Sequence, residues 1–269
     1  MSVDKKLMTI GYDDYDVVEL CHGVYKINEF NLTTMFVIVG QEKAVTIDCG
    51  TGIGDYMAVI RRITDLPVSL IVTHAHVDHI GGRGQFDVMY MSQEDESIIK
   101  DVTVASRKGY VALMKLLGFK VRKKRDMRYD KVTKEPRVEY LRDGDVIDLG
   151  GKTLTVYAIP GHTFGSLGFG LKEDRILFTG DVVNPQCLMF LKHAATLEVM
   201  KSSCQRILSL SEYDTIWASH LSDPIDRDTV LRAIATIEQA QKRGNRLLPW
   251  IIFENKNDFA IIHRANKRK

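Results

Sequence analysis

Short segments of apolar residues, separated by polar residues and glycine-containing turns, run through most of the chain. Segments of this length that are rich in β-branched and aromatic residues are typical of strands. In the first half we predict strands at 23–27, 34–39, 44–47, 68–73 and 88–91. In the second half we predict strands at 138–141, 146–149, 153–159, 168–171, 175–179 and 215–219, and a final hairpin at 250–253 and 259–263.

Apolar residues at helical spacing separate these strands and predict helices at 55–63, 196–210 and 228–242, the last ended by Gly244. A further helical pattern begins with a capping box at Ser92 and continues to about residue 128. This order of elements predicts the α/β class, as an αββα sandwich with two mixed β-sheets packed face to face and helices outside. Since no repeat or linker is present, we predict a single domain over 1–269 with a basic helical insertion at about 92–137.

The composition argues against some classes of function but identifies none. Of the 269 residues, 45% are hydrophobic and 27% are charged, with a net charge of +2, so charge alone indicates no nucleic-acid or membrane partner. We find no signal peptide at the start and no apolar run of roughly 18 residues that would span a membrane. The four cysteines are scattered, which favours reduced thiols and a cytoplasmic location. The oligomeric state is left open.

The strongest chemical signal follows the predicted strand at 68–73. His74, His76, Asp78 and His79 lie within six residues, a density that neither a core nor a surface loop requires. The first two alternate as side chains at a strand end do, and the other two fall on the turn that follows. One short loop can therefore present ligands to two metal ions.

Three further candidates each stand where a predicted strand ends, the usual position of functional side chains on a rigid scaffold. They are His162, Asp181 and His220. Together with the first loop they give five histidines and two aspartates, which suit two ions that share a carboxylate and a water molecule. The remaining histidines are expected to be ordinary core or surface residues: His22, His193 and His263.

The order His-x-His-x-Asp-His, Gly-His, Gly-Asp and a final His resembles the metallo-β-lactamase-fold hydrolase superfamily over about residues 23–220. The resemblance implies that His74, His76 and His162 hold one metal ion, that Asp78, His79 and His220 hold the other, and that Asp181 bridges them. It also implies that Asp78 is the catalytic residue that accepts or passes a proton. Asp48, in the matching strand-Asp-x-Gly element, would orient the histidine loop through hydrogen bonds.

The resemblance implies a metal-dependent hydrolase with two divalent ions, zinc above all, although manganese and iron suit the same ligands. A metal-bound hydroxide would attack an ester, lactone or thioester of a small molecule. Two enzymatic alternatives share much of the ligand set: a phosphodiesterase of the same fold, and a mononuclear iron enzyme resembling persulfide dioxygenases. A non-enzymatic metal-loaded scaffold or sensor is disfavoured, because the ligand set is complete and leaves a position for water.

The sequence departs at several positions from specialised members of this superfamily. The residue at 162 is histidine, where one branch of true lactamases has cysteine. Thr163-Phe164-Gly165-Ser166 follows, where thioesterases such as glyoxalase II and many acyl-homoserine lactonases carry a further histidine. The chain after His220 also lacks the helical extension of glyoxalase II. These differences favour a general small-molecule hydrolase.

Lysine and arginine are concentrated between residues 107 and 142 and are densest at Lys123, Lys124 and Arg125. The plainer interpretation is a solvated helical insertion. The sharper hypothesis is a lid beside the metal site that attracts an anionic substrate, such as a carboxylate or phosphate ester.

Overall fold

The computed structural model describes residues 7–8, 15–116, 120–121, 128–184, 186–189, 191–242, 251–256 and 259–264. Internal contacts divide the chain into two units. Unit 1 comprises Met1–Met91, Glu96–Leu141 and Ile147–Thr153, and unit 2 comprises Ser92–Asp95, Arg142–Val146 and Leu154–Lys269. The single domain over 1–269 stays a prediction.

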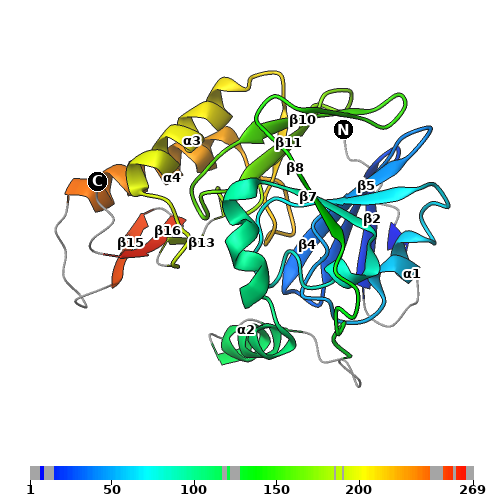
Figure 1. The fold of residues 1–269 in the computed structure, drawn as a ribbon. Coiled ribbons are helices and arrows are strands. Elements are labelled where there is room, and N and C mark those ends of the chain that lie inside the picture. The colour runs from blue at the N-terminus through cyan, green and yellow to red at the C-terminus, as the bar shows by residue number, and fades with distance from the viewer. Residues whose placement is uncertain are drawn as a thin grey trace. The chain divides into compact units, whose positions relative to one another are not determined.

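Unit 1 is built on one eight-stranded sheet in which the strands follow chain order (Figure 1). Its strands are β1 (Leu7–Met8), β2 (Tyr15–Cys21), β3 (Val24–Glu29), β4 (Thr33–Val39), β5 (Ala44–Ile47), β6 (Val68–Ile71), β7 (Val88–Met91) and β8 (Arg137–Tyr140). Neighbours from β1 to β5 are antiparallel, and neighbours from β5 to β8 are parallel. The carboxyl ends of β5, β6 and β7 therefore lie at the same edge of the sheet.

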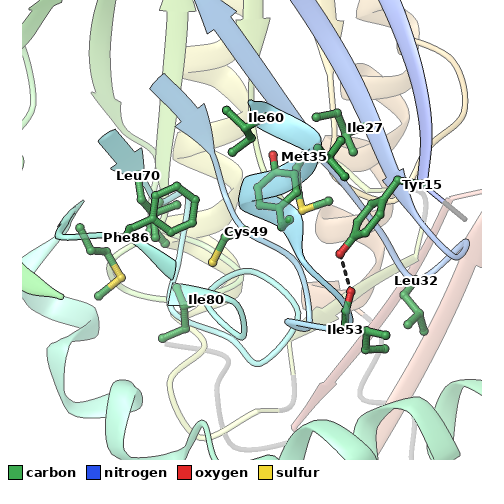
Figure 2. Packing of buried hydrophobic residues seen from close by; sticks show 14 of the residues in the cluster. Tyr15, Ile27, Leu32, Met35, Cys49, Ile53, Ile60, Leu70, Ile80 and Phe86 are labelled. Atoms are coloured by element: carbon green, nitrogen blue, oxygen red, sulfur yellow. Dashed lines mark hydrogen bonds between the residues drawn. The ribbon is translucent and has the colours of Figure 1, made fainter. Parts of the chain in front are cut away.

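The apolar core of unit 1 lies against this sheet (Figure 2). Strand β4 is buried from Thr33 to Ile38, and its Met35 shares one core with side chains from distant loops, among them Ile53, Ile80 and Phe86. The Tyr15 hydroxyl donates a 2.5 Å hydrogen bond to the Ile53 carbonyl, so the ring is buried with its polar atom satisfied. The loops at the carboxyl edge of the sheet are therefore anchored by side chains in the apolar core.

The helices of unit 1 lie between its strands. Helix α1 (Tyr56–Ile60) begins at Asp55, whose side chain accepts a hydrogen bond from the Ala58 N–H. The turn η1 (Arg83–Gln85) follows the histidine loop, and α2 spans Val104–Leu116. The helix predicted from Ser92 begins instead as the 3-10 segment η2 (Gln93–Asp101), in which the Asp95 N–H bonds the Ser92 carbonyl three residues back.

Unit 2 contains most of the second mixed sheet and all of a small third one (Figure 1). The second sheet has the order β14 (Thr215–Trp217), β12 (Ile176–Phe178), β11 (Leu167–Leu171), β10 (Thr153–Ala158) and β9 (Val146–Asp148). The third has the order β13 (Gln186–Met189), β16 (Phe259–Arg264) and β15 (Ile251–Lys256). Helices α3 (Leu197–Ser209) and α4 (Arg227–Lys242) pack on each other.

The predicted fold class is confirmed as two mixed sheets with helices, while the face-to-face packing of the sheets stays a prediction. The final hairpin is confirmed as the antiparallel pair β15 and β16. Strand β2 was missed because its side chains do not alternate: Val17 and Val18 are both apolar and buried, and the pairing with β3 is irregular between Glu19 and Cys21. Gly244 lies outside the described residues. Among the helices that the structure describes, none is long and apolar enough to cross a membrane.

Candidate metal centre

The histidine loop of unit 1 begins at the carboxyl end of β6. His74 and His79 are buried and His76 is half-buried. The ring centroid of His74 lies 4.7 Å from that of His76 and 3.9 Å from that of His79. A tight turn, in which the His79 and Ile80 N–H groups bond the His76 carbonyl, brings the three imidazoles together. Asp78 shares this turn, with Oδ2 3.5 Å from His79 Nε2.

Asp48, at the carboxyl end of β5, supports the histidine loop through hydrogen bonds. Its Oδ1 accepts the Thr73 N–H at 2.8 Å, and its Oδ2 lies 2.8 Å from both Thr73 Oγ1 and His79 Nδ1. Asp48 has a φ of 64°, a left-handed conformation that aspartate tolerates better than most residues. The hydrogen bonds predicted for Asp48 are therefore present.

These hydrogen bonds determine which nitrogen each imidazole presents. A carboxylate only accepts, so His79 must donate its Nδ1–H to Asp48 and keep its lone pair on Nε2. The Thr73 hydroxyl donates to Asp48, and it can therefore only accept at 3.1 Å from His74 Nδ1. Both rings consequently offer Nε2 as a ligand atom, the arrangement that a histidine metal site requires.

Two buried charged residues that sequence reasoning did not single out for the site stabilise its surroundings. Glu29, at the end of β3, accepts the Thr51 N–H at 2.6 Å, the Thr51 hydroxyl at 2.7 Å and the Ile53 N–H at 3.1 Å. Burial raises the pKa of Glu29 to about 7, and the Thr51 hydrogen bonds only partly offset that rise. Glu29 fixes the segment that follows β5.

Arg107, on α2, was counted among the residues of the basic insertion but is only 1% exposed. Its guanidinium donates to the Gly81 carbonyl at 2.7 Å and to the Thr51 carbonyl at 3.2 Å, and also to the Asp130 carbonyl. Gly81 and Gly52 must both lack a side chain here, because a Cβ on Gly52 would lie 2.4 Å from the Gly81 carbonyl oxygen. Arg107 thus anchors the end of the histidine loop rather than meeting solvent.

The raised pKa of Glu29 makes stability depend on pH. The folded chain holds this proton more tightly than the unfolded chain between the ordinary pKa of 4.5 and about 7. The stability contributed by this group is full below pH 4.5 and is lost as the pH rises through 7. We expect Glu29→Gln to flatten the fall of unfolding free energy by up to about 1.4 kcal/mol per pH unit in this window. Urea unfolding of metal-free protein at pH 5 to 8 measures this, with the exposed Glu42→Gln as control, and parallel profiles for Glu29→Gln and wild type would contradict it.

Unit 2 carries the other three candidates at one edge of its sheet. Strands β12 and β14 are parallel, and β10 runs in the same direction because β11 is antiparallel to both β10 and β12. Asp181 follows β12, His220 follows β14 and His162 follows β10. Asp181 Oδ2 lies 3.1 Å from His220 Nε2 and 3.6 Å from His162 Nε2. One carboxylate oxygen thus stands beside two imidazole nitrogens.

All seven predicted ligands are side chains that can offer an atom to a metal ion. Four of them gather in the histidine loop of unit 1 and three at the edge of the unit 2 sheet. Nitrogen and oxygen donors without thiolate suit zinc, manganese or iron. The donor set in each unit therefore fits a divalent ion, which makes both clusters consistent with metal binding.

The family follows from the comparison of the whole chain with known proteins. A family model described as the metallo-beta-lactamase superfamily matches residues 29–220, from the loop-supporting Glu29 to the last candidate ligand. The chain belongs to the metallo-β-lactamase superfamily. As predicted, it is an enzyme of the hydrolase type found in that superfamily.

Individual members of the metallo-β-lactamase superfamily resemble the chain at moderate identity. The acyl-coenzyme A thioesterase MBLAC2 of Homo sapiens is 29% identical over 197 residues, which cover 67% of this chain and 68% of that protein. A hydroxyacylglutathione hydrolase of Bdellovibrio bacteriovorus is 26% identical over 66% of this chain and 59% of that enzyme.

A solved structure supports the same fold. The structure of a stereoselective inverting sec-alkylsulfatase from Pseudomonas sp. superimposes with a TM-score of 0.67 and 13% identity over 85% of this chain. The chain spans 42% of the length of that sulfatase, and at this identity the likeness concerns the fold alone.

Proposed function

We propose that the chain is a dinuclear metal hydrolase that cleaves thioesters of small molecules. In this proposal His74, His76 and His162 bind one ion, Asp78, His79 and His220 bind the other, and Asp181 bridges them. The observation that carries it is the pair of preset clusters: Asp48 leaves the lone pair of His79 on Nε2, and Asp181 Oδ2 lies within 3.6 Å of two histidines. Zinc is the metal we expect first, with manganese and iron as alternatives.

Two bound divalent ions would lower the pKa of a shared water molecule and polarise the substrate carbonyl. The protein's own part is to hold the ligands and to move protons. Asp78 is buried in the histidine loop with Oδ2 3.5 Å from His79 Nε2, and we assign it the role of accepting the proton of the nucleophilic water. Asp48 and Thr73 keep the imidazoles in one orientation throughout the reaction.

The choice of a thioester over an ester or lactone rests on the relatives. The human relative is named as an acyl-coenzyme A thioesterase, and the bacterial one as a hydroxyacylglutathione hydrolase. A thiolate is also a better leaving group than an alkoxide, so a site of this kind needs less assistance to expel it. Esters and lactones are the next substrates to test, because the same attack on a carbonyl would cleave them.

The proposal is tested by a panel of thioester, ester, lactone, β-lactam and phosphodiester substrates on protein reconstituted separately with zinc, manganese and iron. We expect the highest kcat/KM on the thioester. Preference for the phosphodiester would favour the phosphodiesterase alternative, and oxygen uptake with a persulfide on the iron-loaded protein would favour a dioxygenase. Either result would overturn the thioesterase proposal.

We propose a basic cavity in unit 1 as the place where an anionic group of the substrate binds. The cavity, about 320 Å³ in volume, is lined by Arg83, Lys100, Arg107 and Lys131, with Glu135 as the acidic residue among its lining. Arg83 is bound to Glu135 through two hydrogen bonds of 2.8 Å, and Arg107 is bound to carbonyls. The exposed Lys100 and Lys131 are therefore the groups that can meet a carboxylate or phosphate. Lys123, Lys124 and Arg125 of the predicted lid lie outside the described residues.

We expect the double variant Lys100→Ala/Lys131→Ala to raise KM for a thioester with a carboxylate or phosphate group by roughly three- to tenfold, with kcat unchanged, because exposed charges act mainly on encounter and weak binding. Steady-state kinetics on a charged and a neutral thioester measure this. Lys115→Ala on α2, outside the cavity, is the matched control. Equal changes in KM for both substrates would show that the cavity does not select charge.

We also propose that the enzyme acts in the cytoplasm. All four cysteines are thiols rather than disulfides, and Cys49, Cys187 and Cys204 are buried. Burial raises the pKa of each of these three thiols, so they remain protonated and unreactive. Reduced, inert thiols of this kind suit a reducing compartment.

A further inference from the structure

Phe164 is the exposed aromatic residue nearest in sequence to a proposed ligand. It follows His162 by two residues and is 51% exposed. Single exposed apolar residues are ordinary on protein surfaces, and Leu231 on α4 is equally exposed at 52%. Exposure alone therefore does not distinguish Phe164 from other surface residues, but the way its backbone is held does.

A buried carboxylate from a distant segment holds the backbone on both sides of Phe164. Asp95, in η2, is 1% exposed. Its Oδ2 accepts the Thr163 hydroxyl at 2.8 Å and its Oδ1 accepts the Gly165 N–H at 2.9 Å. A Cβ on Gly165 would lie 2.5 Å from the Asp95 carboxyl carbon, so glycine is required for this approach. The Asp95 carboxylate therefore bonds the residue before Phe164 and the residue after it.

Further hydrogen bonds complete the support. The Phe164 N–H donates to the His193 carbonyl at 3.0 Å, and the Ala195 N–H donates to the Gly161 carbonyl at 2.9 Å. The Ser166 hydroxyl oxygen accepts the Thr163 N–H at 3.0 Å. The segment from 161 to 166 is therefore fixed at almost every residue. Burying a carboxylate costs free energy unless hydrogen bonds compensate it, and here its hydrogen bonds go to the residues flanking an exposed phenyl ring.

We propose that Phe164 determines specificity by contacting the apolar acyl chain of the substrate, and that Asp95 is its positioning residue. The inference rests on the proposed function and extends it to thioesters of medium-chain carboxylic acids. An aromatic ring two residues after His162 gains free energy when an alkyl chain covers it, and it loses little entropy because its backbone is already fixed. A short acyl group has little apolar area to place on the ring and gains correspondingly little.

The first test measures binding and needs no turnover. Octanoate and acetate are titrated into metal-loaded protein by calorimetry. We expect Phe164→Ala to weaken octanoate binding about tenfold and to leave acetate binding unchanged, and Phe164→Leu to restore most of the loss. Leu231→Ala is the matched control and should change neither affinity. Unchanged octanoate affinity in Phe164→Ala, or equal losses for both acids, would overturn the proposal.

The positioning role of Asp95 has its own readout in the ratio of octanoate to acetate affinity. We expect Asp95→Ala to lower this ratio several-fold, because Thr163 and Gly165 lose their common partner. The exposed neighbour Glu94→Ala should leave it unchanged. A purely structural role would weaken both acids equally and keep the ratio constant, which would overturn the assignment of Asp95. Absence of thioester cleavage in the wild type would refute the proposed function while these binding results still decide the inference.

Discussion

Asp181→Ala is expected to lower kcat on the best thioester by at least about 1,000-fold, equivalent to roughly 4 kcal/mol. Its Oδ2 lies 3.1 Å from His220 Nε2 and 3.6 Å from His162 Nε2, so its removal takes the shared negative charge from between two ligands. The proposed bridge between the ions would be lost with it. Steady-state kinetics and elemental analysis of the same sample measure the effect, and metal content should fall together with activity.

The matched control for this variant is Asp214→Ala. Asp214 is exposed and pairs with Arg175 at the surface, and an ion pair of this kind contributes little to stability. We expect its kcat and metal content to equal those of the wild type. An Asp181→Ala protein that keeps its metal and turns over within tenfold of the wild type would show that Asp181 is not the bridge.

Asp48→Asn is expected to lower metal affinity by about 10- to 100-fold, the usual cost of losing a partner that orients a ligand. An asparagine amide can face His79 Nδ1 with a donor, which opposes the tautomer that leaves Nε2 free to bind metal. Asparagine is the informative choice because it tolerates the φ of 64° at this position, whereas alanine would add backbone strain. Competition with a chelator of known affinity measures the loss.

Thr73→Val provides a graded comparison for Asp48→Asn. It removes the hydroxyl between Asp48 and His74 but leaves the direct contact with His79, so we expect a smaller loss of affinity. The thermal midpoint of each metal-free variant separates loss of stability from loss of affinity. Affinity within twofold of the wild type in Asp48→Asn would mean that the tautomer of His79 is set by something else.

Much of the unit 1 sheet could be predicted because its signals are local. The strand at 44–47 was predicted with its observed bounds, and so was the strand at 88–91. The ligands could be proposed because four of them share one motif and the other three each follow a strand. The orienting role of Asp48 came from the family resemblance, and its hydrogen bonds with Thr73 and His79 are present.

The supporting residues could not be predicted, because their partners are distant in sequence. Asp95 bonds residues 68 and 70 positions away, and Arg107 bonds Thr51 from 56 positions away. No local pattern distinguishes a buried arginine from its solvated neighbours, which is why Arg107 was grouped with the basic insertion. Glu29 likewise stands at the end of an ordinary strand, and only the fold brings the N–H groups of Thr51 and Ile53 to its carboxylate.

The number of metal ions per chain, measured together with thioester cleavage on the same sample, tests the central claim most directly. We predict about two equivalents of a divalent metal, loss of cleavage when a chelator removes them, and recovery when metal is restored. Full thioester cleavage by protein that elemental analysis shows to be free of metal would contradict the claim.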